Sequence, residues 1–219
     1  MHPPDLLLPR RSSTDPEGLA EYRERGGYAG LAKARDHGGA WLRGEVEAAG
    51  LCGRGGAAFP TIRKWAIAAA AEADEKFVVA NGGEHEPGSN KDRHLVHRHA
   101  HAVIEGLALA GLATGASKGY VYLIEDMQEQ RASVTTALRE ASDANLLPFP
   151  IEVATGPTTY VAGEETAALN AIEGQPAKPR KKPPFPGEAG LFGKPTTVNN
   201  VETLAHVAWI ARHGGAAFA

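Results

Sequence analysis

The chain has 219 residues, 42% of them hydrophobic and 22% charged, which is ordinary for a folded globular protein. Its net charge of −3 excludes a protein-wide basic field for nucleic acid or an anionic membrane, and no apolar run approaches the ~20 residues of a membrane helix. The only cysteine, Cys52, excludes an internal disulfide and an iron–sulfur cluster held by this chain alone, and it indicates a reducing, cytoplasmic compartment.

Residues 1–18 are polar and proline-bearing, which predicts a flexible arm ahead of one domain over residues 19–219. The three leucines of this arm are too few for a secretory signal. Two short helices are expected on either side of Gly26-Gly27. A third helix is expected to end near Gly50, because a glycine suits the left-handed conformation found after a helix C-terminus.

From there on, short apolar runs alternate with longer helical patterns. The expected elements are a glycine loop at 50–61, a helix at 62–73, a strand at 76–81, a loop at 82–93, a helix from Leu95 to Ala113, a strand at 119–125, a helix at 128–143 and a strand at 149–155. Strands that alternate with helices at this spacing predict a parallel sheet with right-handed crossovers.

The glycine loop contains GRGGAAF at 53–59, a loose match to the dinucleotide-binding fingerprint. That fingerprint normally follows a strand, whereas the segment before this loop has a helical pattern, so the standard Rossmann interpretation fails on context. The glycines still allow backbone N–H groups to approach a phosphate or an aromatic ring closely. The alternative is a flexible loop without a ligand.

The segment NGGEHEPG at 81–88 follows the first predicted strand, at the edge where ligands bind in open α/β sheets. Glu84 and Glu86 flank His85 and are suited to hold ribose or ribityl hydroxyls or to position a base. A solvated acidic turn is the alternative for this segment taken alone.

Two further clusters have simpler explanations. The helix after this loop carries four histidines, and two of them, His97 and His101, are spaced i and i+4 as in a metal pair. No third ligand follows, so a polar helix face is favoured and no metal is predicted. The basic run KPRKK at 178–182 would suit nucleic acid, but the acidic net charge ranks that function last.

The last third of the chain places rigid, charged and aromatic residues together. YVAGEET at 160–166 opens a helix with two glutamates, which the helix dipole favours in any case. RKKPPFPGEAGLFGKPTTVNN at 180–200 combines prolines, lysines and phenylalanines, which suits a flat ring that carries phosphates. A disordered basic linker is the alternative.

Several of these motifs together resemble one family. GLCGRGGAAFPTIRKW, VVANGGEHEPGSNKDR, YVAGEETAALNAIEG and PPFPGEAGLFGKPTTVNNVETL are similar to the FMN-containing, NADH-binding flavoprotein subunit of respiratory complex I and its relatives in NAD-reducing hydrogenases and formate dehydrogenases. The resemblance runs from about residue 20 to the end. It implies an α/β fold: a Rossmann-like parallel sheet flanked by helices, with an N-terminal helical and loop extension.

The resemblance also implies an NADH dehydrogenase activity. FMN takes a hydride from NADH, and electrons then pass to an iron–sulfur or ferredoxin-like protein partner, at the periphery of a membrane complex. Carried over by motif, the residues that line FMN are Gly53, Arg54, Gly55, Gly56, Lys64, Asn81, Glu84, Tyr160, Gly163, Glu164, Asn199 and Asn200. Those that face NADH are Phe59, Glu86, Glu165, Lys182 and Phe185.

Within this set the resemblance implies distinct roles. Glu86, Glu164 and Tyr160 are the expected catalytic residues, and Lys64 is expected to meet the FMN phosphate. Glu165 is expected beside the adenosine ribose, where its carboxylate would repel a 2′-phosphate and favour NADH over NADPH.

The chain also departs from the family. Gly83 replaces an aspartate, Ala58 replaces a glycine, and Ile67 stands where an aromatic residue is common. The family's ubiquitin-like fold and iron–sulfur domain do not follow, so we expect the second half of the electron path in another chain. The alternative function is a degenerate or truncated paralogue that binds nucleotide or flavin, or assists assembly, without turnover.

Overall fold

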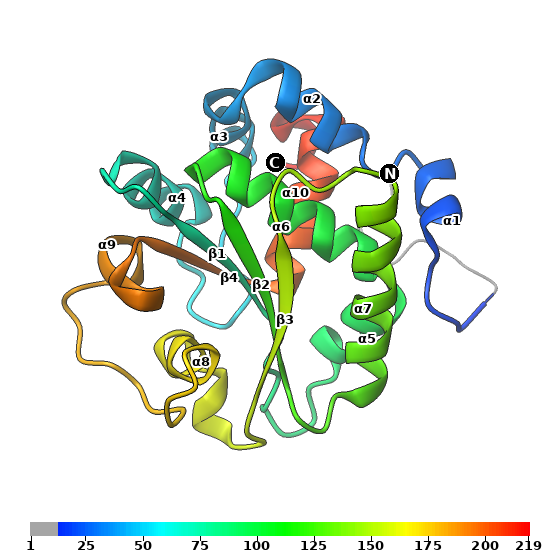
Figure 1. Cartoon of the computed structure of the whole chain (residues 1–219). Coiled ribbons are helices and arrows are strands. Elements are labelled where there is room, and N and C mark those ends of the chain that lie inside the picture. Colours follow the sequence, from blue (N-terminus) through cyan, green and yellow to red (C-terminus); the bar gives the residue numbers. More distant parts are fainter. Residues whose placement is uncertain (1–12) are drawn as a thin grey trace.

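The computed structural model describes residues 13–219 and shows four parallel strands in one sheet (Figure 1). They are β1 (Phe77–Asn81), β2 (Lys118–Ile124), β3 (Ile151–Gly156) and β4 (Thr196–Asn200), in the spatial order β3-β2-β1-β4. The predicted α/β class with a parallel sheet is confirmed. The three strands expected from apolar runs begin within two residues of their predicted positions. β1 and β2 are almost wholly buried, as the apolar character of their sequences indicated.

Helices surround this sheet and precede it. Their bounds are α1 (Leu19–Glu24), α2 (Ala29–His37), α3 (Gly39–Ala48), α4 (Thr61–Ala70), α5 (Lys91–Arg98), α6 (Ala100–Thr114), α7 (Gln128–Asp143), α8 (Glu165–Ile172), α9 (Pro186–Ala189) and α10 (Val201–His213), with short 3-10 turns η2 (Tyr160–Gly163), η3 (Leu191–Gly193) and η4 (Gly215–Ala217). None of the helices in residues 13–219 combines the length and apolar character that a bilayer span requires.

The two faces of the sheet are covered unequally. The larger core joins one face to α6, α10 and the N-terminal helices, and its fully buried members include Val78, Ile104 and Leu204. A smaller core on the other face joins Val79 and Tyr122 to side chains from α8 and η3. Figure 1 accordingly shows α8 on the opposite side of the strands from α6 and α10.

The strand order creates a switch point between β1 and β4. The chain adds β2 and β3 on one side of β1, whereas β4 pairs with the other side. Connections that leave neighbouring strands in opposite directions open a crevice at their carboxyl ends, where ligands of α/β proteins bind. In this chain that crevice lies where Asn81 and Asn200 stand in register.

The prediction of one continuous helix from Leu95 to Ala113 is wrong. It is broken at His99, whose φ of −131° and ψ of 41° leave the helical region between α5 and α6. The break makes room for the segment before α1: the Glu17 backbone N–H donates to the Arg98 carbonyl at 3.0 Å, and Glu17 Oε2 lies 3.4 Å from His99 Nδ1. A tertiary partner therefore overrides the local periodicity.

That partner comes from the segment predicted as a flexible arm. Residues 1–12 lie outside the described residues. Glu17, near the end of the segment, is buried and paired with Arg25, so this part of it packs on the domain. The N-terminal helices are fixed through the buried carboxylate of Glu105, which accepts from the Tyr22 hydroxyl at 2.5 Å and the Tyr28 N–H at 2.9 Å.

β4 and α10 were not expected from the sequence. β4 reads TTVNN, which is too polar for a buried-strand pattern, although its β-branched residues favour a strand. The signals for α10 are clearer, because Asn200 caps its first turn and Gly214 follows its last residue. These two elements complete the crevice.

The close approach of α6 to α10 gives a test of the fold. A Cβ atom on Gly106 of α6 would come within 2.0 Å of the Leu204 carbonyl oxygen of α10, so we expect Gly106→Ala to lower the free energy of unfolding by at least about 2 kcal/mol. Gly44 in α3 is the matched control, because a Cβ there meets nothing within 4 Å. Gly44→Ala should stabilise by about 0.5–1 kcal/mol through helix propensity. Urea unfolding measures both, and equal effects would contradict the close packing of α6 on α10.

Candidate functional site

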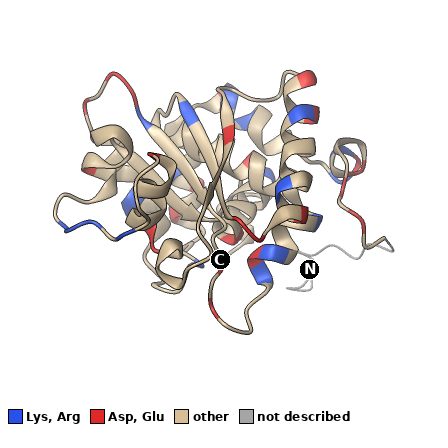
Figure 2. Ribbon diagram, turned by 60° about the horizontal axis from the view of Figure 1, so that its bottom comes forward, with Lys and Arg blue, Asp and Glu red and all other residues tan. Residues whose placement is uncertain are grey.

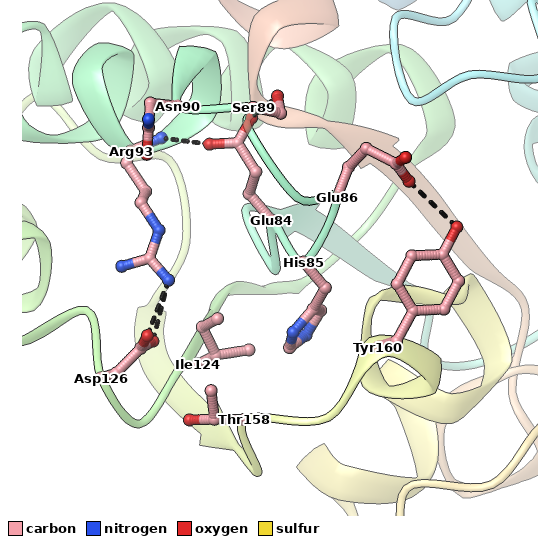
Figure 3. Close-up of a pocket in the computed structure, with 10 residues that line it drawn as sticks. All are labelled: Glu84, His85, Glu86, Ser89, Asn90, Arg93, Ile124, Asp126, Thr158 and Tyr160. Carbon is pink, nitrogen blue, oxygen red and sulfur yellow. Dashed lines mark hydrogen bonds and ion pairs between the residues drawn. The ribbon is translucent and has the colours of Figure 1, made fainter.

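The loop after β1 forms one wall of the crevice. Asn81 ends the strand, and its side-chain amide donates to the Gly163 carbonyl at 2.9 Å, while its Oδ1 accepts from the Gly83 N–H at 3.1 Å. Two segments far apart in sequence, 81–86 and 160–165, are therefore joined through one asparagine. Beside this contact, the Tyr160 hydroxyl donates to Glu86 Oε2 at 3.0 Å (Figure 3).

The carboxylate of Glu84, in the same loop, is hydrogen-bonded within the protein. Its carboxylate accepts from the backbone N–H groups of Asp92 and Arg93, both at 3.1 Å, and from the Ser89 hydroxyl at 2.5 Å. It thus satisfies the free donors at the start of α5. Glu84 is only 8% exposed, so its carboxylate fixes the loop and is not free to hold a ligand in this arrangement.

A network of four charged side chains lies at the junction of α4, α8 and the loop before α9. Lys64 Nζ lies 2.7 Å from Glu165 Oε2, and Lys182 Nζ lies 3.1 Å from Glu165 Oε1 and 2.9 Å from Glu164 Oε1. Burial raises the pKa of Glu165, but Lys64 and Lys182 outweigh it and hold that pKa below its ordinary value. All four are predicted site residues, and the structure brings them together.

Glu164 has a second function in the backbone. Its side chain accepts from the Thr166 N–H at 2.8 Å and the Ala167 N–H at 2.9 Å, which caps α8. Its other oxygen, Oε1, holds Lys182. The side chain therefore connects the start of α8 to the basic loop.

The glycine loop is docked on the first turn of α10. The Arg54 N–H donates to Thr203 Oγ1 at 2.9 Å, and a Cβ on Gly55 would lie 3.5 Å from Asn200 Cβ. The loop follows helix α3, so the context expected from the sequence is confirmed. Ala58 has a φ of 48°, a left-handed conformation in which a glycine would be unstrained.

The two asparagines at the end of β4 differ in their surroundings. Asn200 Oδ1 accepts from the Glu202 N–H at 3.0 Å, and its Nδ2 donates to Asp92 Oδ2 at 2.6 Å, so both polar atoms are used within the protein. Asn199 Oδ1 accepts from Trp65 Nε1 at 3.3 Å, whereas its Nδ2 is buried without a partner among the described residues. An unpaired buried donor is costly, which makes this amide a candidate contact for a ligand acceptor.

The predicted aromatic residues stand at the rim. Phe59 is 40% exposed and Phe185 is 53% exposed, which leaves both available to a flat ligand. Phe185 precedes α9, and α9 packs against α4 where a Cβ on Gly187 would meet the Ile67 side chain at 3.0 Å. Ile67, one of the three departures named from the sequence, therefore lies in the contact between α4 and α9 beside Phe185.

A cavity of about 400 Å³ adjoins the loop after β1 on the side of β2 and β3. Most of its lining residues were not assigned to a site from the sequence, among them Asn90, Arg93, Asp126 and Thr158. Figure 3 shows Arg93 facing Asp126, with nitrogen–oxygen distances of 2.8 and 3.0 Å. His85 also lines the cavity, where burial lowers the pKa of its imidazole.

Gly83 lies where a side chain would be confined. A Cβ at this position would lie 3.0 Å from Tyr122 Cε1, and the Tyr122 ring is fully buried beside it. The space that a side chain at residue 83 would need is therefore occupied in part by Tyr122.

Other residues of the site lie next to predicted ones but were missed. Trp65 follows Lys64 directly, and Lys91 and Asp92 belong to the motif that holds Glu84. Their roles depend on tertiary contacts, so the available signal was only their place inside the family motifs. Of the two histidines considered as a metal pair, His97 contacts Ser133, and His101 contacts Tyr28 and Glu140. Within residues 13–219, no group of three or more His, Cys, Asp or Glu side chains is placed to hold a metal ion.

Charge is spread over the surface. Figure 2 shows acidic and basic residues interspersed on the face that it presents, in keeping with the net charge of −3. The basic run at 178–182 is partly neutralised, because Lys182 pairs with Glu164 and Glu165 and Arg180 pairs with Glu173.

A Rossmann-like α/β domain with clustered lysines, glutamates and asparagines at its switch point defines a nucleotide-binding protein. The chain belongs to the Nuo51 FMN-binding domain family, whose model matches residues 46–209. The predicted family and its cofactor, FMN, are thereby confirmed.

Relatives agree with this assignment. The chain is 40% identical to the F subunits of NADH-quinone oxidoreductase in Rhodobacter capsulatus and Escherichia coli K12, over 89% and 93% of this chain and 48% of each relative. It also matches the crystal structure of an NAD+-reducing NiFe hydrogenase in the air-oxidised state, with a TM-score of 0.81, 36% identity, and coverage of 93% of this chain and 36% of that one. The chain spans about half the length of the curated relatives that it matches.

The charge network around α10 predicts a pH dependence of stability. His206, whose Nε2 lies 3.6 Å away, and Lys91, whose Nζ lies 2.9 Å away, hold the pKa of Glu202 at about 2. A carboxyl whose pKa is depressed on folding stabilises the protein above its ordinary pKa of 4.5, and this contribution is lost as the pH falls toward 2. In urea unfolding between these pH values, Glu202→Gln should lose less stability than wild type.

Lys91→Met provides a second variant for this test. It removes one of the two cations that favour ionised Glu202. We therefore expect its free energy of unfolding to depend less on pH than that of wild type, but by a smaller margin than for Glu202→Gln. A Glu202→Gln profile that runs parallel to wild type would contradict the proposed origin of the acid sensitivity.

Proposed function

We propose that this domain binds FMN in the β1/β4 crevice and transfers a hydride from NADH to it, with electrons passing on to a separate iron–sulfur protein. The observation that carries the proposal is the pair of donors near the end of β4: Lys64 Nζ, 3.5 Å from the Val198 carbonyl oxygen, and the unpaired N–H group of Asn199. The Asn199 donor calls for an acceptor, which a flavin ring supplies, and Lys64, which is paired with Glu165, offers a positive charge to a flavin phosphate.

The residues present fit FMN. The buried Asn199 donor has no partner in residues 13–219, and Gly53, Gly55 and Gly56 let the backbone of the loop approach a ligand closely. Lys64 is paired with Glu165 in the structure, and a phosphate would compete for the same ammonium group. Asn81 and Gly163 hold the wall between the two segments.

The residues of the chain would position the reactants. A bound flavin supplies the hydride-accepting chemistry, and the protein orients it and excludes water. Glu86 and Tyr160 are hydrogen-bonded to each other at the mouth, where Tyr160 is 70% exposed and accessible to a second ligand. Glu164 is paired with Lys182, so the proposed catalytic roles of these residues are orientation and charge placement.

NADH recognition is proposed for the outer part of the site. Phe59 and Phe185 offer exposed rings for stacking, and Lys182 offers an ammonium group for a diphosphate. Glu165, held between Lys64 and Lys182, would face the adenosine ribose and disfavour a 2′-phosphate. Glu84 is proposed to act through the position of its loop, because its carboxylate caps α5.

The electron acceptor is proposed to be a partner protein. Relatives are subunits of NADH-quinone oxidoreductase or, by structure, an NAD+-reducing hydrogenase, and this chain spans about half of the curated ones. We propose a cytoplasmic module that is peripheral to such a complex. The domain division, with an arm at 1–18 and one binding domain at 19–219, remains a prediction.

A binding or assembly module without turnover is the second candidate. Gly83 favours it, since the carboxylate that the family resemblance implies at this position is lost and Tyr122 crowds the space. Flavin that binds but is not reduced by NADH would support this candidate over the enzyme.

Flavin binding tests the proposed site directly. Lys64→Met removes the ammonium group at the crevice, and we expect the Kd for FMN to rise about tenfold to hundredfold, the weight of one charge-assisted hydrogen bond. Lys194→Met is the matched control, because Lys194 pairs with Asp74 before the amino end of β4. Quenching of flavin fluorescence measures both. Equal affinities of the two variants for FMN would show that Lys64 does not contact the flavin.

Turnover tests the choice of nucleotide. After reconstitution with FMN, ferricyanide reduction should proceed with NADH and much more slowly with NADPH. Glu165→Gln removes the repelling charge, so the ratio of kcat/KM for NADH over NADPH should fall by about fivefold or more. The ratio cancels any general loss of flavin. An unchanged ratio would show that Glu165 does not face the ribose.

A further inference from the structure

The orientation of the Asn199 side chain is set by a residue that no motif assigns to the site. Trp65 of α4 is completely buried, and its Nε1 lies 3.3 Å from Asn199 Oδ1. Lys64, the preceding residue of α4, reaches the Val198 carbonyl at 3.5 Å. One turn of α4 therefore contacts two successive residues of β4 at its carboxyl end.

The chemistry of the indole group fixes which way the amide points. An indole N–H only donates, so the atom of Asn199 that faces it must be the carbonyl oxygen. In the flipped amide, two donors would face each other and Trp65 would lose its partner. Because both side chains are buried, the orientation with Nδ2 directed away from Trp65 is strongly preferred.

This orientation leaves an unused hydrogen-bond donor near the carboxyl end of β4. Asn199 is 7% exposed, and its Nδ2 has no partner among the described residues. The ammonium group of Lys64, which is paired with Glu165 and lies 3.5 Å from the Val198 carbonyl oxygen, is also a donor at this end of β4. A ligand atom that satisfies this end of β4 must therefore be an acceptor, as a flavin carbonyl, ring nitrogen or phosphate oxygen is.

We propose that Trp65 is a positioning residue for the flavin: through its N–H it holds the Asn199 amide so that a free N–H meets an acceptor of the cofactor. The proposal rests on the proposed FMN function and adds to it the polarity of this contact and the residue that imposes it. Trp65 itself does not touch the ligand.

The test uses the full chain and a double-mutant cycle. Trp65→Phe keeps a buried ring and removes the donor, and we expect the Kd for FMN to rise about fivefold. Asn199→Ala should raise it about tenfold, and the double variant should match Asn199→Ala alone, because Trp65 acts only through Asn199. Trp41→Phe in α3 is the matched control and should leave the Kd unchanged.

A spectroscopic signal separates positioning from packing. The side-chain amide resonances of Asn199, identified by their absence in Asn199→Ala, should shift when FMN is added to wild type, and this shift should shrink in Trp65→Phe. Should Trp65→Phe fail to fold, Asn199→Asp serves instead. It keeps the acceptor for Trp65, replaces the free donor by an oxygen, and should bind FMN more weakly than Asn199→Ala.

The outcomes are distinct. If wild type binds no FMN, the proposed function fails. If wild type binds FMN but Trp65→Phe binds equally well, or weakens binding by the same factor in the Asn199→Ala background, the positioning role is overturned while the function stands. Asn199→Asp with wild-type affinity would also overturn it.

Discussion

The parallel pairing of β1 with β4 is the constraint on which the site depends. It sets Ala80 beside Asn199 and Asn81 beside Asn200, so that polar side chains from two distant motifs reach one edge of the sheet together. A slip of one residue would exchange the faces on which these side chains lie. The register is protected by the core, because Val78 and Val79 are buried on opposite faces of the same strand. Stability and site geometry are therefore fixed by the same contacts.

The helices that begin at this edge of the sheet are capped by side chains of the predicted site. Glu84 caps α5, Asn200 caps α10, and Glu164 caps α8, so three helix starts are fixed by residues of the predicted site. A cap replaced by alanine costs roughly 1 kcal/mol. Residues that the family motifs assign to ligand contacts thus carry structural functions too, and variants at these positions report both.

Sequence reasoning reached the fold class and the strands made of apolar runs, because their periodicity is a local property. It missed the break at His99, since that break depends on Glu17 from a distant segment, and it missed β4, whose Asn-rich end resembles a loop. For the site, the family motifs supplied Lys64, Glu165 and Lys182, which the structure brings together. The motifs could not show that Glu84 is occupied or that Trp65 orients Asn199, because both depend on which backbone and side-chain groups meet in space.

The departures from the family have different physical meanings. Ala58 keeps the left-handed backbone that a glycine would adopt freely, at a cost on the order of 1 kcal/mol, and such strain persists where the surrounding structure requires the conformation. Gly83 is instead accommodated, because Tyr122 fills part of the space beside it. The glycine loop therefore retains its shape despite a changed residue, while the loop after β1 has exchanged a charge for packing. The retained shape of the glycine loop favours flavin binding. The carboxylate lost at Gly83 would change the charge close to a bound flavin. Gly83 is therefore the departure through which turnover is most directly open to test, whereas the glycine loop keeps the backbone shape that the proposed flavin site uses.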